Sequence, residues 1–370
     1  MQTYIVDLQS SVSDSFRCQK AANSLDIDVK KKLKHVLKID ADLEKQFNLG
    51  LIVGSSGSGK TTLAKKIYGN DCFTEYLDLS KTILDQMPKE LSYDDCVSNL
   101  LAMGLGSVPC WLRPTHTLSN GQRARAEAVL QLTVKNQTNV TIIDEWTSVV
   151  DRTVAKAMSN CIQKASRKLK KTIILLSCHY DVIEWLNPDW IIDCNKQKYE
   201  DRRSMVGTFE RTDRLRLDIR KVERSSWRYF SKYHYLSDRL PGGEIFLFGL
   251  FHNDQQIGFQ CFAGYVPGKQ NILHFNRTVI HPDYVGLGLG IKLINETSQI
   301  MAKKGYKIMG KFSNVAVFNA MKKYRNLWKF EGSTVDYTLK MGAIVSKNNR
   351  EKTLRKKVRV YRFRYIGKTL

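Results

Sequence analysis

Short apolar runs alternate with a long amphipathic stretch along the first half of the chain. The runs at residues 49–53, 140–143 and 172–176 have the length of buried strands, and residues 4–8 add a further short strand. Between the second and third runs, residues 154–169 are rich in Ala, Lys and Met and predict a helix. Strands that alternate with helices indicate a mainly parallel sheet covered by helices, which is an α/β fold.

The pattern changes after a polar, charged stretch at about residues 195–224. Beyond it, we expect an aromatic helix at 226–236 and then a series of strands and helices of the α+β class, the first two strands joined as a hairpin through His252–Gln255. The later elements are expected at 245–251, 256–265, 273–280, 291–304, 307–312 and 316–324. The predicted boundaries are 1–200 for a first domain, 201–224 for a charged linker, 225–346 for a second domain and 347–370 for a basic tail.

Composition agrees with a globular chain of more than one domain. The 370 residues are 42% hydrophobic and 10% aromatic, which is enough apolar material for packed cores. The sequence has no run of 18 apolar residues, and residues 1–14 lack the basic and apolar segments of a secretory signal, so we expect a cytoplasmic protein without a membrane partner. The eight cysteines form no CxxC pair and indicate neither a disulfide framework nor a zinc ribbon.

The net charge of +23 is concentrated in the second half. Residues 1–200 carry 26 basic and 23 acidic side chains, whereas residues 201–370 carry 33 and 13. Residues 347–368 alone contain ten basic residues and one acid. Because clustered Lys and Arg release counterions from phosphate backbones, nucleic acid is the expected partner, with a solvated basic face as the alternative.

A phosphate-binding loop is present at residues 54–61, between a predicted strand and a predicted helix. The segment matches GxxxxGK[ST], in which the glycines let backbone N–H groups point at phosphates. Lys60 would then reach the terminal phosphates and Thr61 would bind Mg²⁺. The expected nucleotide contacts in this loop are Gly54, Gly57, Gly59, Lys60, Thr61 and Thr62.

Two carboxylates follow the strand at 140–143. Asp144 is positioned to hold the Mg²⁺ water shell, and Glu145 to polarise an attacking water. Acids at a strand end can also be purely structural, and the phosphate loop upstream is what favours the catalytic interpretation.

With these motifs and the segment Leu118-Ser119-Asn120-Gly121-Gln122, residues 1–195 resemble the ABC ATPase family. The resemblance implies an ATP-dependent homodimer in which the signature residues Ser119, Gly121 and Gln122 bind the γ-phosphate of nucleotide held by the partner protomer. It also implies a Q-loop role and an Mg²⁺ contact for Gln86, a D-loop role for Asp151 and a switch role for His179, although an isolated histidine is more often a core residue. Asn120 and Trp146 depart from the usual glycine and proline, and neither change removes a catalytic group.

A second glycine-rich turn at residues 286–290 follows a predicted strand and opens a helix. Gly286, Gly288 and Gly290 would expose N–H groups suited to a pyrophosphate, although such turns also serve close packing. With its surroundings, the turn resembles the acyl-CoA site of GNAT acyltransferases over residues 215–335. The resemblance implies acetyl-CoA or another acyl-CoA as donor and Tyr324 as the acid that protonates the departing thiolate. Val285 replaces the usual Gln or Arg, and a packed aromatic is the alternative for Tyr324.

The aromatic segment 227–237 is similar, more distantly, to the Mom-type branch of that fold, which modifies adenine in DNA. Tyr233, His234 and Tyr235 would supply stacking surfaces for an exposed base, and His234 would act as general base. An amphipathic helix that packs its aromatic side chains into the core is the alternative.

We therefore expect two enzymatic activities, an ABC-type ATP hydrolase and an N-acyltransferase that uses acyl-CoA to modify nucleic acid, as in DNA modification. One alternative is a nucleic-acid-binding ATPase whose GNAT-like module is catalytically inactive. A second alternative is a protein or aminoacyl-tRNA N-acetyltransferase.

Overall fold

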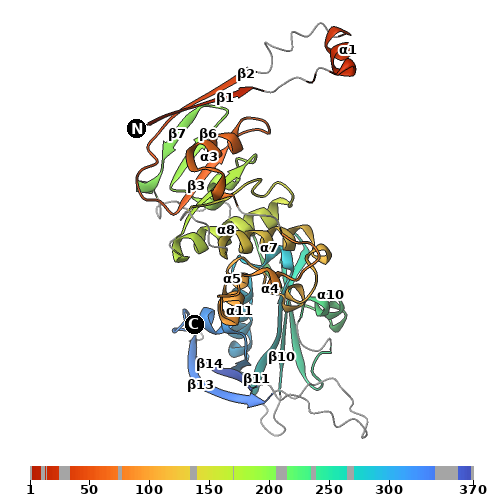
Figure 1. The fold of residues 1–370 in the computed structure, drawn as a ribbon. Coiled ribbons are helices and arrows are strands. Elements are labelled where there is room, and N and C mark those ends of the chain that lie inside the picture. The colour runs from red at the N-terminus through yellow and green to blue at the C-terminus, as the bar shows by residue number, and fades with distance from the viewer. Residues whose placement is uncertain are drawn as a thin grey trace. The chain divides into compact units, whose positions relative to one another are not determined.

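The chain divides into two compact units. The computed structural model describes residues 2–9, 13, 15–24, 34–73, 77–133, 140–169, 171–205, 215–234, 239–264, 271–337 and 357–367. The first unit comprises residues 1–92 and 114–212, and the second comprises residues 93–113 and 213–370 (Figure 1). The division near residue 212 falls inside the expected linker, whereas the grouping of residues 93–113 with the second unit has no counterpart in the sequence prediction.

A five-stranded sheet forms the centre of the first unit, in the order β4-β5-β3-β6-β7. Its first four strands are parallel and β7 is antiparallel. The bounds are β3 Leu49–Val53, β4 Val140–Ile143, β5 Thr172–Ser177, β6 Trp190–Asp193 and β7 Lys198–Asp201. A separate antiparallel pair joins β1 (Gln2–Gln9) to β2 (Lys34–Ala41).

The helices of the first unit include the two that the nucleotide motifs predict. The bounds are α1 Phe16–Ser24, α3 Lys60–Tyr68, α4 Ile83–Gln86, α7 Asn120–Thr133, α8 Arg152–Leu169 and α9 Val182–Leu186. Residues 93–113 form α5 (Tyr93–Ala102) and α6 (Val108–Trp111). Among the described residues, no helix combines the length and the apolar character that crossing a bilayer requires.

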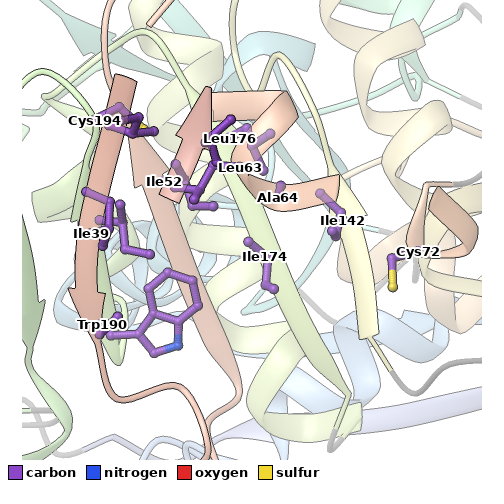
Figure 2. Close-up of a cluster of buried hydrophobic side chains, with 14 of the residues drawn as sticks. Ile39, Ile52, Leu63, Ala64, Cys72, Ile142, Ile174, Leu176, Trp190 and Cys194 are labelled. Atoms are coloured by element: carbon purple, nitrogen blue, oxygen red, sulfur yellow. The ribbon is translucent and has the colours of Figure 1, made fainter. Parts of the chain in front are cut away.

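A buried cluster fixes the strand that leads into the phosphate loop. Figure 2 shows Ile52 of β3 packed with Leu63 of α3 and with Ile174 of β5. Trp190 lies in the same cluster, and a Cβ at Gly50 would come within 2.1 Å of its ring, so only glycine fits at that position of β3. Apolar burial on both sides of β3 therefore holds the start of the loop in place.

A seven-stranded sheet forms the second unit, in the order β13-β14-β12-β11-β10-β9-β8. Its neighbours are antiparallel except for the parallel pair β11 and β12. The bounds are β8 Asp218–Lys221, β9 Ile245–His252, β10 Gln255–Ala263, β11 Ile272–Ile280, β12 Lys307–Phe312, β13 Trp328–Tyr337 and β14 Lys357–Tyr365. The helices are α10 Trp227–Phe230, α11 Leu289–Lys303 and α12 Val315–Met321.

The expected hairpin between β9 and β10 is confirmed, since His252 pairs with Gln255. The two residues between them, Asn253 and Asp254, have φ angles of 48° and 61°. Asn and Asp tolerate this left-handed conformation because their short side chains bond locally.

Three elements differ from the sequence prediction. Residues 357–365, assigned to a basic tail, form β14 in the interior of the sheet, where Phe363 is 1% exposed and belongs to the core. Residues 218–221, assigned to the linker, form β8 and pair with β9. The aromatic helix expected at 226–236 is a four-residue α-helix flanked by 3₁₀ turns, and Tyr235 lies outside the described residues.

Candidate functional site

The phosphate loop runs from the end of β3 into α3, and two of its glycines have left-handed backbone. Gly57 has a φ of 76° and Gly59 a φ of 90°. Gly59 is the N-cap of α3, and none of the described side chains caps this helix, so its first N–H groups face the loop. Gly54 donates its N–H to Ser177 O (3.3 Å), and Thr62 lies exposed on α3. The arrangement is suited to an anion.

Lys60 is buried although it is charged, with 6% of its surface exposed. Its Nζ donates to Gly54 O and Ser55 O, each at 2.9 Å. The ammonium group is thereby held at the mouth of the loop.

Thr61 and Asp144 meet beside the loop. Thr61 Oγ1 donates to Asp144 Oδ2 at 2.7 Å, and Asp144 Oδ1 accepts from the N–H of Glu145 at 2.8 Å. Mg²⁺ is usually held by one or two protein oxygens together with phosphate oxygens and water, so this pair fits that ion. The described residues contain no group of three or more His, Cys, Asp or Glu that could hold a metal alone.

Glu145 is exposed, at a sharp bend after β4. Its φ is 51°, and Thr147 at 68° continues the bend. Ser148 Oγ donates to Glu145 Oε2 and lies 3.8 Å from Cys178 Sγ, which in turn lies 3.6 Å from His179 Nδ1. One chain of polar contacts thus joins the predicted catalytic glutamate to the predicted switch histidine.

The signature segment forms the start of α7. Ser119 N donates to Gln122 Oε1 (3.2 Å), and Gln122 N donates to Ser119 Oγ (3.4 Å), which is a reciprocal capping box. Gly121 lies against α8, where an added Cβ would be 3.0 Å from Val154 Cγ1. Asp151 plays a similar part in α8, because its carboxylate accepts from the N–H groups of Thr153 and Val154 (2.9 and 3.0 Å).

Gln86 is engaged away from the Thr61–Asp144 pair. Its Oε1 accepts from Asp78 N (2.7 Å), and its Nε2 donates to Asp78 O (3.0 Å) and Thr82 O (3.1 Å). The structure therefore gives this side chain a role in holding a turn, and the Mg²⁺ contact stays a prediction.

Three residues outside the sequence motifs support the loop. Asn195 Oδ1 accepts from both Ser55 N (3.2 Å) and Ser55 Oγ (3.0 Å), and its Nδ2 donates to Tyr180 Oη (3.2 Å). Tyr180 Oη donates to Asp193 at 2.9 Å, and burial together with this bond raises the pKa of Tyr180 to about 12. Sequence reasoning misses these residues, because they come together only when β6 pairs with β3.

The second glycine turn follows β11 after the intervening 3₁₀ turn Pro282–Tyr284. Gly286 and Gly288 have φ angles of 102° and 77°, and Gly288 is the N-cap of α11, whose first turn contains Gly290. β11 pairs with β12 only from Ile272 to Phe275 and then continues to Ile280 without it. The two parallel strands therefore separate toward the glycine turn.

The environment of His234 does not suit a general base. Its ring lies 5.7 Å from that of Trp227, and burial lowers its pKa to about 4. Burial thus makes this ring a weak base, and its role as general base stays a prediction.

A different histidine, His281, lies at the end of β11 beside the glycine turn. Its Nε2 is 3.4 Å from Tyr233 Oη and its Nδ1 is 3.4 Å from Asp283 Oδ2, while its ring stacks on Tyr229 at 5.9 Å. The sequence carries a signal for it in His281-Pro282-Asp283, which leads directly into the turn.

Tyr324 follows α12 and is 36% exposed, so it is not a packed core aromatic.

No model of a known protein family matches the chain, and no curated protein matches its sequence. Solved structures similar to parts of it fall into two groups. The ribosomal-protein-S18-alanine N-acetyltransferase from Escherichia coli is 13% identical, with 41% of this chain and 96% of that one covered at a TM-score of 0.32. The ATP-binding cassette MJ0796, in a post-hydrolysis dimer bound to ADP and Pi, is 14% identical, with 45% and 92% covered at a TM-score of 0.35. Similarities this low carry no argument, so the function of the chain has to be inferred from its own residues.

Proposed function

We propose that the chain is an ABC-type ATPase coupled to a GNAT-like acyltransferase that takes an acyl-CoA and modifies nucleic acid. The observation that carries the ATPase is the meeting of Thr61 Oγ1 and Asp144 Oδ2 at 2.7 Å beside a complete phosphate loop with a buried Lys60. The observation that supports the acyltransferase is the glycine turn, which follows β11 after that strand has separated from β12.

In the ATPase, each residue has a separate task. Lys60 would contact the terminal phosphates, and Thr61 with Asp144 would hold Mg²⁺, which when bound neutralises phosphate charge. Glu145 would accept a proton from the attacking water, and Ser148 would hold its carboxylate in one orientation. His179 would face the γ-phosphate from the end of β5.

Homodimerisation would complete the site, as the signature residues would reach the nucleotide of the partner protomer. Ser119 lies exposed at the N-terminus of α7, where the helix dipole favours a phosphate. ATP is therefore expected to drive association, and hydrolysis to be cooperative.

Substitution of Glu145 tests the ATPase. Glu145→Gln should retain ATP binding and accumulate dimer while hydrolysis stops, whereas Lys60→Ala should weaken binding itself. Glu184→Gln, on the exposed face of α9, is the matched control and should hydrolyse ATP normally. Normal hydrolysis by Glu145→Gln would remove this glutamate from the mechanism.

For acyl transfer, we assign the base to His281 in place of His234. The acceptor nitrogen would attack the thioester carbonyl and the C–S bond would break. The acceptor proton would pass to His281, and Tyr324 would protonate the departing thiolate. In the tautomer with its hydrogen on Nδ1, Asp283 Oδ2 would accept that hydrogen, orient the imidazole and leave Nε2 as the base.

Gly288→Val tests the donor site. The left-handed φ of 77° disfavours valine, and its side chain would occupy the space in front of the helix N-terminus. Acyl-CoA binding, measured by calorimetry, should be lost while ATP hydrolysis is unchanged. The absence of acetyl-CoA binding by the unsubstituted chain would select the rival proposal of a catalytically inactive module.

A further inference from the structure

One face of the second unit's sheet is basic across three adjacent strands, β12, β14 and β13. Along β14, Tyr361, Phe363 and Tyr365 point into the core that contains Met301 of α11. The alternate residues Arg362 and Arg364 therefore point to the opposite face. We call this second surface the basic sheet face.

The strand register places like charges side by side on the basic sheet face. Lys311 of β12 pairs with Arg362, and Lys329 of β13 pairs with Arg364. All four side chains are exposed. Arg364 forms an ion pair with Glu331 (Nε–Oε1 3.0 Å).

Like charges directly opposite each other on neighbouring strands repel, and the Arg364–Glu331 ion pair offsets part of this repulsion. Adjacent strands lie about 4.8 Å apart and alternate residues about 6.7 Å apart, so the backbone holds these cationic side chains in a compact array. A polymer with regularly spaced negative charges is complementary to such an array.

We infer that the basic sheet face binds the phosphate backbone of nucleic acid. The inference depends on the proposed nucleic-acid substrate and says where that substrate is held. Along each strand, a duplex presents one charge per about 3.4 Å of its axis, so one two-residue step along β14 spans about two phosphates of one strand. Phe330, the neighbour of Lys329 along β13, packs against Phe318 and Phe363 on the other side of the sheet.

The expected contacts are to phosphate and carry no base specificity. Binding at the basic sheet face would therefore fix the position of the nucleic acid, and selection of a particular base would occur beside His281. The two functions should be separable by substitution.

The test is a triple variant of the full chain, Lys311→Gln, Lys329→Gln and Arg362→Gln, which leaves the Arg364–Glu331 ion pair intact. The matched control removes three exposed lysines of the helical layer and its turns, Lys303→Gln, Lys304→Gln and Lys323→Gln. Binding of a fluorescein-labelled DNA duplex of about 30 base pairs is followed by anisotropy between about 50 and 200 mM salt. Circular dichroism and urea unfolding check that both variants fold.

Each lost phosphate contact lowers the slope of log K against log salt by about 0.9, so three contacts lower it by about 2.7. The ratio of Kd at high salt to Kd at low salt should then fall about 40-fold in the triple variant and stay unchanged in the control. An equal fall of this Kd ratio in the triple variant and in the control would overturn the inference. The attraction would then be a diffuse effect of net charge.

An error in the proposed substrate class gives a different result from an error in the location of the binding face. If the unsubstituted chain binds neither DNA nor RNA duplexes, the nucleic-acid substrate is wrong and the inference fails with it. Binding instead to vesicles of phosphatidylserine and phosphatidylcholine, or to poly-glutamate, would assign the basic sheet face to a membrane or to an acidic protein.

Discussion

Substitution of Ser119 separates the structural role of the signature segment from its proposed contact with nucleotide. In the structure, Ser119 caps α7 through Gln122, and in the proposed dimer it faces a γ-phosphate. Alanine removes both interactions. Aspartate keeps an oxygen acceptor for the cap and adds a negative charge.

The expected changes in stability follow from the cap geometry. The bond from Gln122 N to Ser119 Oγ is long, at 3.4 Å, and exposed, so Ser119→Ala should lower the free energy of unfolding by about 0.5–1 kcal/mol. Ser119→Asp should leave it near the original value, because a carboxylate at a helix N-terminus is favourable.

The two substitutions rank in the opposite order for their effect on ATP-dependent dimerisation, where Ser119→Asp should be the more damaging. Ser119→Ala loses one hydrogen bond to a charged group, about 1.5–3 kcal/mol per site. Ser119→Asp places a carboxylate against a phosphate, which costs about 4 kcal/mol per site at a separation of about 4 Å. ATP-dependent association, measured by sedimentation in a Glu145→Gln background, should thus be weakest in the more stable variant. Normal ATP-driven dimerisation of Ser119→Asp would refute the placement of Ser119 at the nucleotide.

Two further predictions concern the second unit. Phe363→Ala should lower the free energy of unfolding by about 3–5 kcal/mol, because the ring is 1% exposed, whereas Arg362→Ala should change it by no more than about 0.5 kcal/mol. At a urea dependence of about 2 kcal/mol/M, the urea midpoint followed by tryptophan fluorescence should fall by about 2 M only in the first variant. His234 has a pKa of about 4 in the fold against about 6.5 unfolded, so the unfolded chain binds more protons between these values. The contribution of neutral His234 to the free energy of unfolding is therefore complete above pH 6.5, and up to about 3 kcal/mol of it is lost as the pH falls to 4. His234→Gln should abolish this loss, as measured by urea unfolding at each pH.

The parts of the site that sequence can predict are those built by contiguous residues. The loop from Gly54 to Thr61 and the acids after β4 are fixed by local spacing, because a strand, a glycine-rich turn and a helix must follow in that order. The residues that hold the loop are not predictable in the same way. Asn195 reaches Ser55 across 140 residues of sequence, and only strand pairing brings them together.

Residues 347–368 contain a strand-like alternation of aromatic and basic residues, which their high charge makes easy to miss. Aromatic residues at 361, 363 and 365 alternate with basic ones, which is the period of a strand with one buried face. Ten basic residues in the segment favour a solvated tail instead. Likewise, His234 is a candidate base in the sequence because a free imidazole titrates near neutral pH, and burial in the fold lowers its pKa to about 4.

The position of β14 has a consequence for how the protein is made. A ribosome produces β12 and β13 before β14, yet β14 lies between them, and β13 has no other partner strand in the described sheet. At about 5–20 residues per second, the interval from the end of β13 to the end of β14 is about 1–6 s. During that interval the nascent chain presents the free edges of β12 and β13, which are templates for pairing with another chain. Yield of the folded protein should therefore depend on how quickly residues 338–365 are translated and on chaperones that cover those edges.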